Sequence, residues 1–269
     1  MHGFLRRTSG GFGGALAALL LGLAFDAAAS AATLEEIEAC VVANAPEKTM
    51  RQSQTLSIAD RKGTERSLEI DFEWKRFEGN RSKFLMRVTS PPDMRGSALL
   101  VIENKDRAND VFSYLPELGK ARRLTSRALS GSAFSSDFSQ EDLQYLRTLL
   151  RDGDQKILPD SEMDGRPVHV VQSSTQAGSA YDEVVTYIDV ERCVLVRAEM
   201  RGSDGKVLKI LRADPEKVVS RGKAFEMTEV RAEDLVRGTH SVLRIEESET
   251  DIRIRDNVFT RGGLERRGR

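Results

Sequence analysis

Apolar and charged residues alternate over residues 68–74, and the alternation returns in 84–88. A period of two is typical of a β-strand with one apolar and one charged face. Glu78-Gly79-Asn80, between the two stretches, is a turn sequence, so the pair predicts an antiparallel hairpin. The apolar side chains expected on one face of this hairpin are Leu68, Ile70, Phe72, Trp74, Phe84, Met86 and Val88.

Short apolar or alternating stretches continue to residue 247, and most of them are separated by tight turns. About eleven strands joined in this way predict a mainly β protein with one large antiparallel sheet, curved or partly closed. No βαβ unit and no glycine-rich phosphate loop is found in the sequence. The further strands are expected at 97–103, 110–115, 121–125, 156–162, 168–174, 183–190, 193–200, 207–211, 224–231 and 240–247.

Two stretches depart from the strand pattern. Residues 33–42 predict a short helix, with Thr33 as N-cap and Glu36 completing a capping box. Residues 126–151 contain a Ser/Gly/Phe tract followed by a helical pattern, and an interruption of this length needs a reason. Two explanations are open: a flap over one face of the sheet, or a packed excursion that caps the core. The apolar candidates for a lid in this stretch are Phe134, Phe138, Leu143 and Leu146.

The first 31 residues have the three parts of a secretory signal peptide. Arg6 and Arg7 precede an apolar run at 15–25, and Ala29 and Ala31 occupy the positions that a signal peptidase reads. A membrane anchor is the alternative, but the run is shorter than the roughly 20 residues needed to span a bilayer. We therefore expect export, with cleavage near Ala31.

The composition argues against two further classes of protein, nucleic-acid binders and proteins with several membrane spans. The chain has 41 basic and 42 acidic residues, so its net charge of −1 gives no basic field for nucleic acid. With 39% apolar residues it is too polar for a protein with several membrane spans.

The two cysteines, Cys40 and Cys193, both follow the expected cleavage site. In an oxidising compartment a disulfide between them is the leading prediction, and two separate buried thiols are the alternative. His169 and His240 have no metal-ligand spacing, so neither a metal nor another cofactor is predicted.

No set of catalytic residues is recognisable. The chain has no G-x-S-x-G elbow and no H-E-x-x-H motif, and His169 is read as a residue of a strand. Glu141 and Asp142 are explained as acids in the first turn of a helix, where the helix dipole favours them. We therefore expect a protein that is not an enzyme.

An ordered set of short motifs resembles a known family, the periplasmic outer-membrane lipoprotein-sorting proteins with the LolA/LolB-like fold. The set extends over nearly the whole chain after the signal, and it is specific as a set, whereas each motif alone is weak. The classical carrier of this group is shorter, and its cavity arginine cannot be matched to a residue here. The motifs are Cys40 with Asn44-Ala45-Pro46, Ser90-Pro91-Pro92-Asp93-Met94-Arg95-Gly96-Ser97-Ala98-Leu99-Leu100, Tyr114-Leu115-Pro116-Glu117-Leu118-Gly119-Lys120-Ala121-Arg122-Arg123, Ser130-Gly131-Ser132, Ser136-Asp137-Phe138, Glu141-Asp142-Leu143, Ile188-Asp189 before Cys193, and Phe259-Thr260 with Leu264-Glu265-Arg266.

The resemblance implies an open, strongly curved antiparallel sheet, in effect an incomplete β-barrel, around an apolar cavity with a lid of helices and loops. Residues 32–269 would form this single domain. A solid core is the alternative, because any sheet covered by helices buries the same alternating face. The inward candidates for lipid binding are the seven apolar residues of the hairpin together with Phe112 and Tyr114.

The function expected from these observations is that of a periplasmic carrier. It would bind lipid or lipoprotein acyl chains during traffic to the outer membrane, with an inner-membrane exporter as a possible partner. One alternative is an accessory or sensor protein of the same fold that acts with such a membrane partner without ferrying cargo. Another alternative is a hydrolase that uses the serines of residues 130–139.

Overall fold

The structure is a computed structural model that describes residues 32–105, 107–150, 154–175 and 177–266. The expected signal peptide, residues 1–31, lies outside these ranges. Within them, no helix is both long and apolar enough to cross a membrane.

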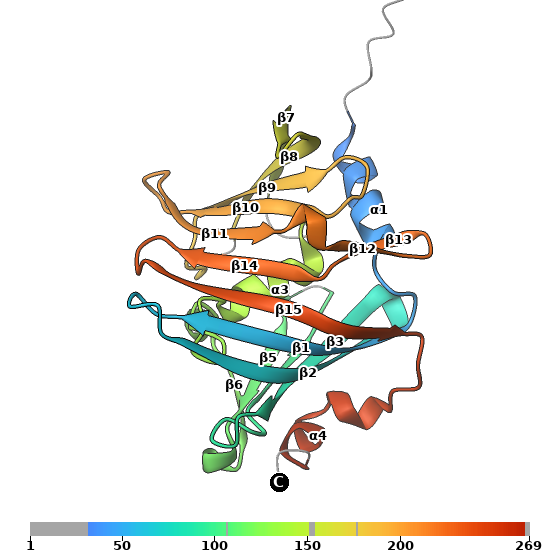
Figure 1. Cartoon of the computed structure of the whole chain (residues 1–269). Helices are drawn as coiled ribbons and strands as arrows, with labels where there is room; N and C mark the ends of the chain where they lie inside the picture. The colour runs from blue at the N-terminus through green and yellow to red at the C-terminus, as the bar shows by residue number, and fades with distance from the viewer. Residues whose placement is uncertain (1–31, 106, 151–153, 176, 267–269) are drawn as a thin grey trace, which may run out of the picture. The chain divides into compact units, whose positions relative to one another are not determined.

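Thirteen strands form one antiparallel sheet in the order β6-β5-β4-β3-β2-β1-β15-β14-β11-β10-β9-β8-β7 (Figure 1). Its edges, β6 and β7, do not pair with each other, so the sheet is open, which confirms the predicted fold class. Strands β12 and β13 form a separate hairpin. The bounds are β1 (Thr49–Ala59), β2 (Glu65–Phe77), β3 (Arg81–Ser90), β4 (Ala98–Ile102), β5 (Asp110–Tyr114), β6 (Ala121–Arg123), β7 (Gln155–Met163), β8 (Arg166–Ser174), β9 (Glu183–Asp189), β10 (Leu195–Arg201), β11 (Val207–Ala213), β12 (Val218–Arg221), β13 (Ala224–Met227), β14 (Glu229–Asp234) and β15 (Thr239–Thr250).

Two features of this sheet were not predicted. Strand β1 is absent from the expected set, although it pairs with β2 along its whole length and with β15 on its other side. The expected strand at 224–231 is two strands, β13 and β14, which belong to different sheets. The centre of the sheet is therefore the β1–β15 pair, formed by segments from opposite ends of the chain.

The helices are few and short: α1 (Leu34–Ala43), α2 (Ser126–Leu129), α3 (Gln140–Thr148) and α4 (Arg261–Arg266). Thr33 and Glu36 form the predicted capping box of α1. Ser139 and Asp142 form a second capping box at the start of α3. Each box satisfies backbone N–H groups that the first turn of a helix leaves without partners.

Apolar clusters cover both faces of the sheet. One contains Leu99 and Val101 of β4 and packs against α1 and α3. Their neighbour Leu100 belongs to a second cluster, together with Phe259 and Leu264 of the C-terminal segment. Successive side chains of a strand point to opposite faces, so these two clusters lie on opposite sides of the sheet.

Buried polar contacts fix α3 against one half of the sheet. Asp142 is fully buried, and its Oδ2 accepts hydrogen bonds from Lys209 Nζ at 2.6 Å and from the Ser139 amide at 2.7 Å. Its Oδ1 accepts one from the Tyr181 hydroxyl at 3.1 Å. Tyr145 on the next turn lies 2.6 Å from the Thr186 hydroxyl of β9. The opposite side of α3 is thereby directed towards β1, β2 and β3.

The tract at residues 130–139 packs into the structure. Asp137 is 3% exposed, and its carboxylate accepts hydrogen bonds from Thr239 Oγ1 at 2.5 Å, Ser241 Oγ at 2.7 Å and Arg237 Nη2 at 2.8 Å. Phe138 is buried in the cluster beside α3. These contacts are those of a packed excursion, one of the two explanations that the sequence left open.

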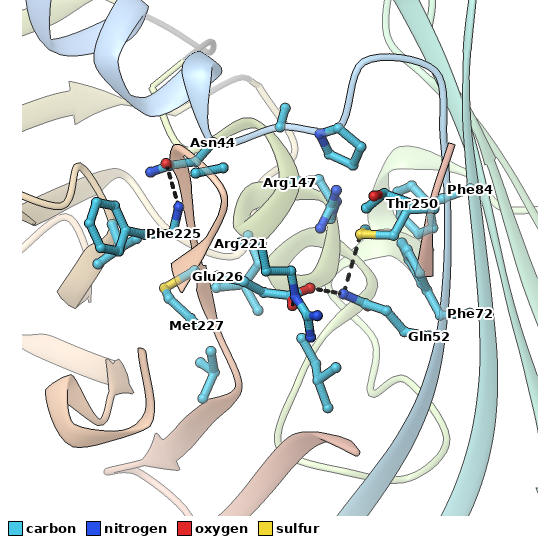
Figure 2. Close-up of a pocket in the computed structure, with 18 of the residues that line it drawn as sticks. Asn44, Gln52, Phe72, Phe84, Arg147, Arg221, Phe225, Glu226, Met227 and Thr250 are labelled. Atoms are coloured by element: carbon cyan, nitrogen blue, oxygen red, sulfur yellow. Dashed lines mark hydrogen bonds and ion pairs between the residues drawn. The ribbon is translucent and has the colours of Figure 1, made fainter. Parts of the chain in front are cut away.

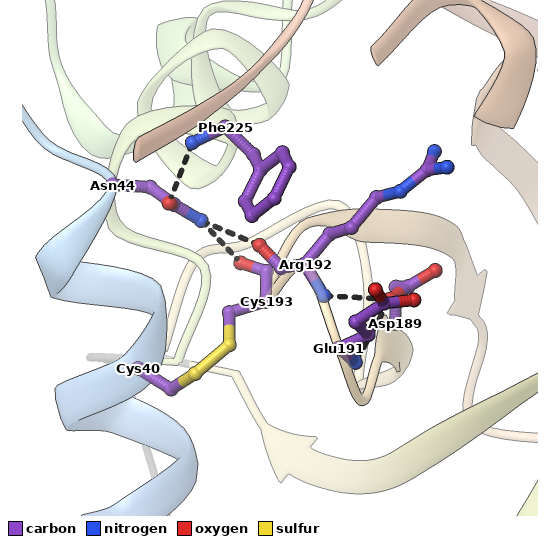
Figure 3. Close-up of a disulfide and its surroundings, with 7 residues drawn as sticks. All are labelled: Cys40, Asn44, Asp189, Glu191, Arg192, Cys193 and Phe225. Atoms are coloured by element: carbon purple, nitrogen blue, oxygen red, sulfur yellow. Dashed lines mark hydrogen bonds between the residues drawn. A yellow bond between two sulfur atoms is a disulfide. The ribbon is translucent and has the colours of Figure 1, made fainter. Parts of the chain in front are cut away.

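The predicted disulfide between Cys40 and Cys193 is present and joins α1 to the turn between β9 and β10 (Figure 3). Asn44, the C-cap of α1, strengthens this junction with three hydrogen bonds. Its Nδ2 donates to the Arg192 and Cys193 carbonyls at 2.8 and 3.1 Å, and its Oδ1 accepts from the Phe225 amide at 2.9 Å. One amide side chain therefore connects α1, the β9–β10 turn and the β12–β13 hairpin.

Removing the disulfide should lower the free energy of unfolding. The bond closes a loop of 153 residues, and for such a loop the chain-entropy model gives about 5 kcal/mol as an upper figure. The double variant Cys40→Ser/Cys193→Ser should therefore unfold at a lower urea concentration than the oxidised wild type. Urea titration with and without reductant measures the shift, and two free thiols in the native wild-type protein would contradict the pairing.

Breaking the buried ion pair should destabilise the protein more than breaking an exposed one. Lys209→Met leaves the Asp142 carboxylate buried without its cation, a change that typically costs about 3–5 kcal/mol. The control Lys206→Met removes an exposed cation paired with Asp204 and should cost under about 1 kcal/mol. Urea denaturation compares them, and equal midpoints would show that the buried pair does not hold α3.

Candidate ligand-binding cavity

A cavity of about 330 Å³ lies between α3, the sheet and the β12–β13 hairpin (Figure 2). One wall comes from β1, β2 and β3, and another from β14 and β15. The side of α3 that faces away from the Asp142–Lys209 pair forms the third wall. The end of α1 and the β12–β13 hairpin close the fourth side.

Most of the cavity surface is apolar. Met50, Met86 and Met227 come from three different strands, and their flexible thioethers adapt to irregular shapes. Of the lipid-binding and lid candidates that the sequence singled out, five line this cavity. They are Phe72, Phe84 and Met86 of the sheet and Leu143 and Leu146 of α3.

The other sequence candidates lie elsewhere. Leu68, Ile70, Trp74 and Val88 are buried in the cluster beside the cavity without lining it, as is Phe138, and Phe134 packs against that cluster. Phe112 and Tyr114 belong to the cluster on the opposite face, with Phe259 and Leu264. The pairing of β4 with β5 sets Phe112 opposite Leu100, on that same face. Their expected place at the cavity is therefore wrong.

The β12–β13 hairpin is a part of the wall that sequence reasoning missed. It contributes Ala224, Phe225 and Met227 to the cavity. The Asn44 side chain holds its Phe225 amide, and the Thr228 amide donates to the Lys217 carbonyl at 2.8 Å at its base. The Arg221-Gly222-Lys223-Ala224 sequence is a turn signal, and Gly222 adopts a φ of 65° that favours glycine.

A chain of polar side chains crosses the floor of the cavity along β1. Gln54 Nε2 donates to Gln52 Oε1 at 2.7 Å, and Gln52 Nε2 donates to Glu226 Oε1 at 2.6 Å. Ser248 Oγ donates to the same Glu226 oxygen at 3.0 Å, and Arg221 Nε donates to the other. This chain links the sheet to the hairpin. Gln54 Oε1 is buried and has no hydrogen-bond partner in the described part of the chain.

Arg147 is the cation that enters the cavity from α3 (Figure 2). Its guanidinium carbon lies 5.3 Å from the centre of the Phe72 ring, a cation–π distance. Burial lowers the pKa of Arg147 to about 10, against the opposing effect of the Glu226 charge. The group is therefore still charged at neutral pH.

A second hollow, of about 630 Å³, lies on the other side of α3, next to the loop before β5 and the loop before β9. Its lining is more polar and includes Glu141 and Ser179. Burial raises the pKa of Glu141, while hydrogen bonds from the Ser179 hydroxyl and the Ala180 amide act in the opposite direction.

Serines of the 130–139 tract take part in local hydrogen bonds. Ser132 Oγ donates to the Ser136 carbonyl, Ser136 Oγ donates to the Ala133 carbonyl, and Ser139 Oγ accepts from the Asp142 amide. These serines, which the hydrolase alternative would use, therefore have structural hydrogen bonds. Across the described ranges, no group of three His, Cys, Asp or Glu side chains is placed to hold a metal.

Several known structures have a fold similar to that of this chain. A domain assigned as an outer membrane lipoprotein-sorting protein from Vibrio parahaemolyticus is 21% identical, with a TM-score of 0.75, over 86% of this chain and 97% of that one. A DUF1329 family protein from Desulfovibrio piger is 20% identical, with a TM-score of 0.78, over 85% and 96%. A LolA superfamily protein from Nitrosomonas europaea is 19% identical, with a TM-score of 0.69, over 87% and 100%.

No curated protein matches the sequence. One family model, whose description reads "-like: Uncharacterized protein", matches residues 80–266, which is well over half of the chain. The chain therefore belongs to this family, and it has the fold of LolA superfamily and outer membrane lipoprotein-sorting proteins.

Proposed function

We propose that this protein is a periplasmic carrier that binds lipid or lipoprotein acyl chains in the cavity between α3, the sheet and the β12–β13 hairpin. The observation that carries the proposal is the cavity itself, about 330 Å³ in volume, with an apolar lining from six strands and two helices. Phe72, Phe84, Met86, Leu143 and Leu146 are the proposed contacts for hydrocarbon.

The physical basis is the transfer of hydrocarbon out of water. Each methylene buried in an apolar site contributes about 0.8 kcal/mol. The lining is adaptable, because methionines from β1, β3 and β13 meet there. Adaptable contacts suit a carrier, since cargo must be released as well as held.

The proposed setting is the cell envelope. The sequence of residues 1–31 is that of an export signal, and the disulfide between Cys40 and Cys193 suits an oxidising compartment. Similar structures include one assigned to outer membrane lipoprotein sorting. An inner-membrane exporter is the partner class that such traffic calls for. The activity proposed is binding and transfer, without chemistry on the cargo.

Filling the cavity should abolish binding of an apolar ligand. Leu146 is half-buried on α3 and lines the cavity, so Leu146→Trp introduces an indole into the space that hydrocarbon would take. The affinity for the neutral apolar fluorophore N-phenyl-1-naphthylamine should fall at least ten-fold, or about 1.4 kcal/mol. Fluorescence titration measures this affinity.

The matched control is Leu118→Trp, at an exposed leucine in the turn between β5 and β6, which should leave the affinity unchanged. Equal loss in both variants, or none in either, would count against this cavity as the binding site.

Native cargo should be recovered with the mature protein. Mass spectrometry of protein purified from the periplasm under mild conditions should detect lipid or acylated peptide in the wild type and much less in Leu146→Trp. If neither preparation contains lipid and the wild type binds no apolar fluorophore, the carrier proposal fails. An accessory protein that acts through its surface then becomes the better hypothesis.

A further inference from the structure

The cavity contains a cation, Arg147, for which no ion pair is found among the described residues. The Nε of Arg147 is buried and makes no hydrogen bond to any of the described residues. Figure 2 shows its side chain reaching into the space between Phe72 and Phe84 on one side and Glu226 on the other. A buried charge without a counter-ion is costly to a folded protein, because desolvation is not repaid by an ion pair.

Glu226 does not supply the missing counter-ion. Its carboxylate accepts hydrogen bonds from Gln52, Ser248 and Arg221, and it forms its ion pair with Arg221. Glu226 also acts on Arg147 through its charge, but it pairs directly with Arg221, so these three groups together leave a net charge of +1.

The acids Glu47 and Asp251 also line the cavity, but both are exposed at its rim. The Asp251 carboxylate accepts a hydrogen bond from the Lys48 amide at 3.1 Å. The interior of the cavity thus carries one uncompensated positive charge next to an apolar lining.

We infer that the cavity takes a single-chain amphiphile with one anionic group, a carboxylate or a phosphate, and that Arg147 binds this group. The inference rests on the proposed function and specifies the chemical class of its ligand. A volume of about 330 Å³ is near the lower end of the range of about 300–1,000 Å³ for small-molecule sites, which favours one chain over several.

The chemistry of the guanidinium fits this role. A planar guanidinium forms two parallel hydrogen bonds with a carboxylate or a phosphate, and it stacks on aromatic rings at the same time. Arg147 lies over Phe72, so its position is set by a ring that also lines the cavity. The anionic end and the hydrocarbon end of one ligand would therefore be held side by side. Burial lowers the pKa of Arg147 because it disfavours the charged guanidinium, and a bound anion would stabilise that charge.

The test compares ligands that share one palmitoyl chain. Palmitate, palmitoyl lysophosphatidic acid and neutral monopalmitoylglycerol are titrated against wild-type protein loaded with N-phenyl-1-naphthylamine, and displacement is followed by fluorescence. We expect at least one of the two anions to bind about ten-fold more tightly than the neutral ligand, which corresponds to about 1.4 kcal/mol. Preference for palmitate alone assigns a carboxylate ligand, and preference for the lysophospholipid alone assigns a phosphate.

Arg147→Met should remove this preference and leave binding of the neutral fluorophore within about three-fold of wild type, because the apolar lining remains. Arg147→Lys retains the positive charge but cannot form the two parallel hydrogen bonds, so it should keep part of the preference. The control Arg51→Met removes an exposed cation that pairs with Glu73 away from the cavity, and it should keep the full preference.

Two outcomes would overturn the inference, and a third would overturn the proposed function. Equal affinity of the wild type for anionic and neutral ligands overturns the inference and leaves the carrier proposal standing. A preference that survives in Arg147→Met also overturns it. Absence of fluorophore binding in the wild type overturns the proposed function itself. If Arg147→Met does not fold, the comparison of anionic with neutral ligands in the wild type and in Arg147→Lys still tests the inference.

Discussion

One short helix cannot fill the concave face of a thirteen-stranded sheet. Neighbouring strands lie about 4.8 Å apart, whereas α3 has nine residues and rises about 1.5 Å per residue. Asp142 and Tyr145 attach this helix to β11 and β9, so it lies closer to one half of the sheet. The space left on its other side is the cavity. The rest of the architecture can be understood as the closure of that space by the end of α1 and the β12–β13 hairpin.

The closing elements are connected both to one another and to the sheet. Asn44 bonds to the β9–β10 turn and to the hairpin, and Cys40 is covalently bound beside it. The hairpin reaches the sheet through Glu226, which accepts hydrogen bonds from Gln52 of β1 and Ser248 of β15. Polar contacts therefore define the wall on this side, while apolar contacts define it on the side of β2 and β3.

The sequence predicted the β2–β3 hairpin well, because apolar and charged residues alternate strongly there. Residues 68–74 lie in β2 and residues 84–88 in β3, which pair as predicted, and the capping box of Thr33 marks the start of α1 correctly. Strand β1 was missed because Gln52 and Gln54 occupy inward positions where the pattern requires apolar residues. Those two glutamines form the polar floor of the cavity. The local pattern thus failed at a place where the structure departs from a plain core.

Alternation separates the residues of a strand into two sets but does not say which set faces inward. In β4 both sets are apolar, since Leu99 and Leu100 are equally buried on opposite faces. Phe112 was therefore assigned to the wrong face, because the C-terminal segment that covers it is remote in sequence. Nothing in the sequence marked Arg147 as a residue of the cavity. A basic residue near the end of a helix is ordinarily explained by the helix dipole, and only the packing around Phe72 shows that Arg147 is half-buried, with its Nε fully enclosed.

The motifs that carried the resemblance have structural roles of their own. Asn44 joins three elements, and Asp137 holds the tract at 130–139 through the side chains of β15. Asp189 accepts hydrogen bonds from the Glu191 and Arg192 amides and so shapes the turn that presents Cys193 (Figure 3). These residues hold the frame of the cavity, and most of its lining, apart from Asn44, Ala45, Pro46, Leu143 and Cys193, comes from residues outside those motifs. A shared frame is thus compatible with ligands that differ from one protein to another.

The pairing of β1 with β15 has a consequence for the order of folding. Met50 lies opposite Thr250, so this ladder joins residues about two hundred positions apart, while β2–β6 and β7–β11 are meanders of neighbouring strands. Local hairpins form quickly, and contacts of large sequence separation form late because loop closure must come first. Each meander can therefore assemble as the chain emerges, but the two halves join only when the last strand has arrived. The cavity exists only from that moment, so a partly synthesised chain has hairpins but no cavity.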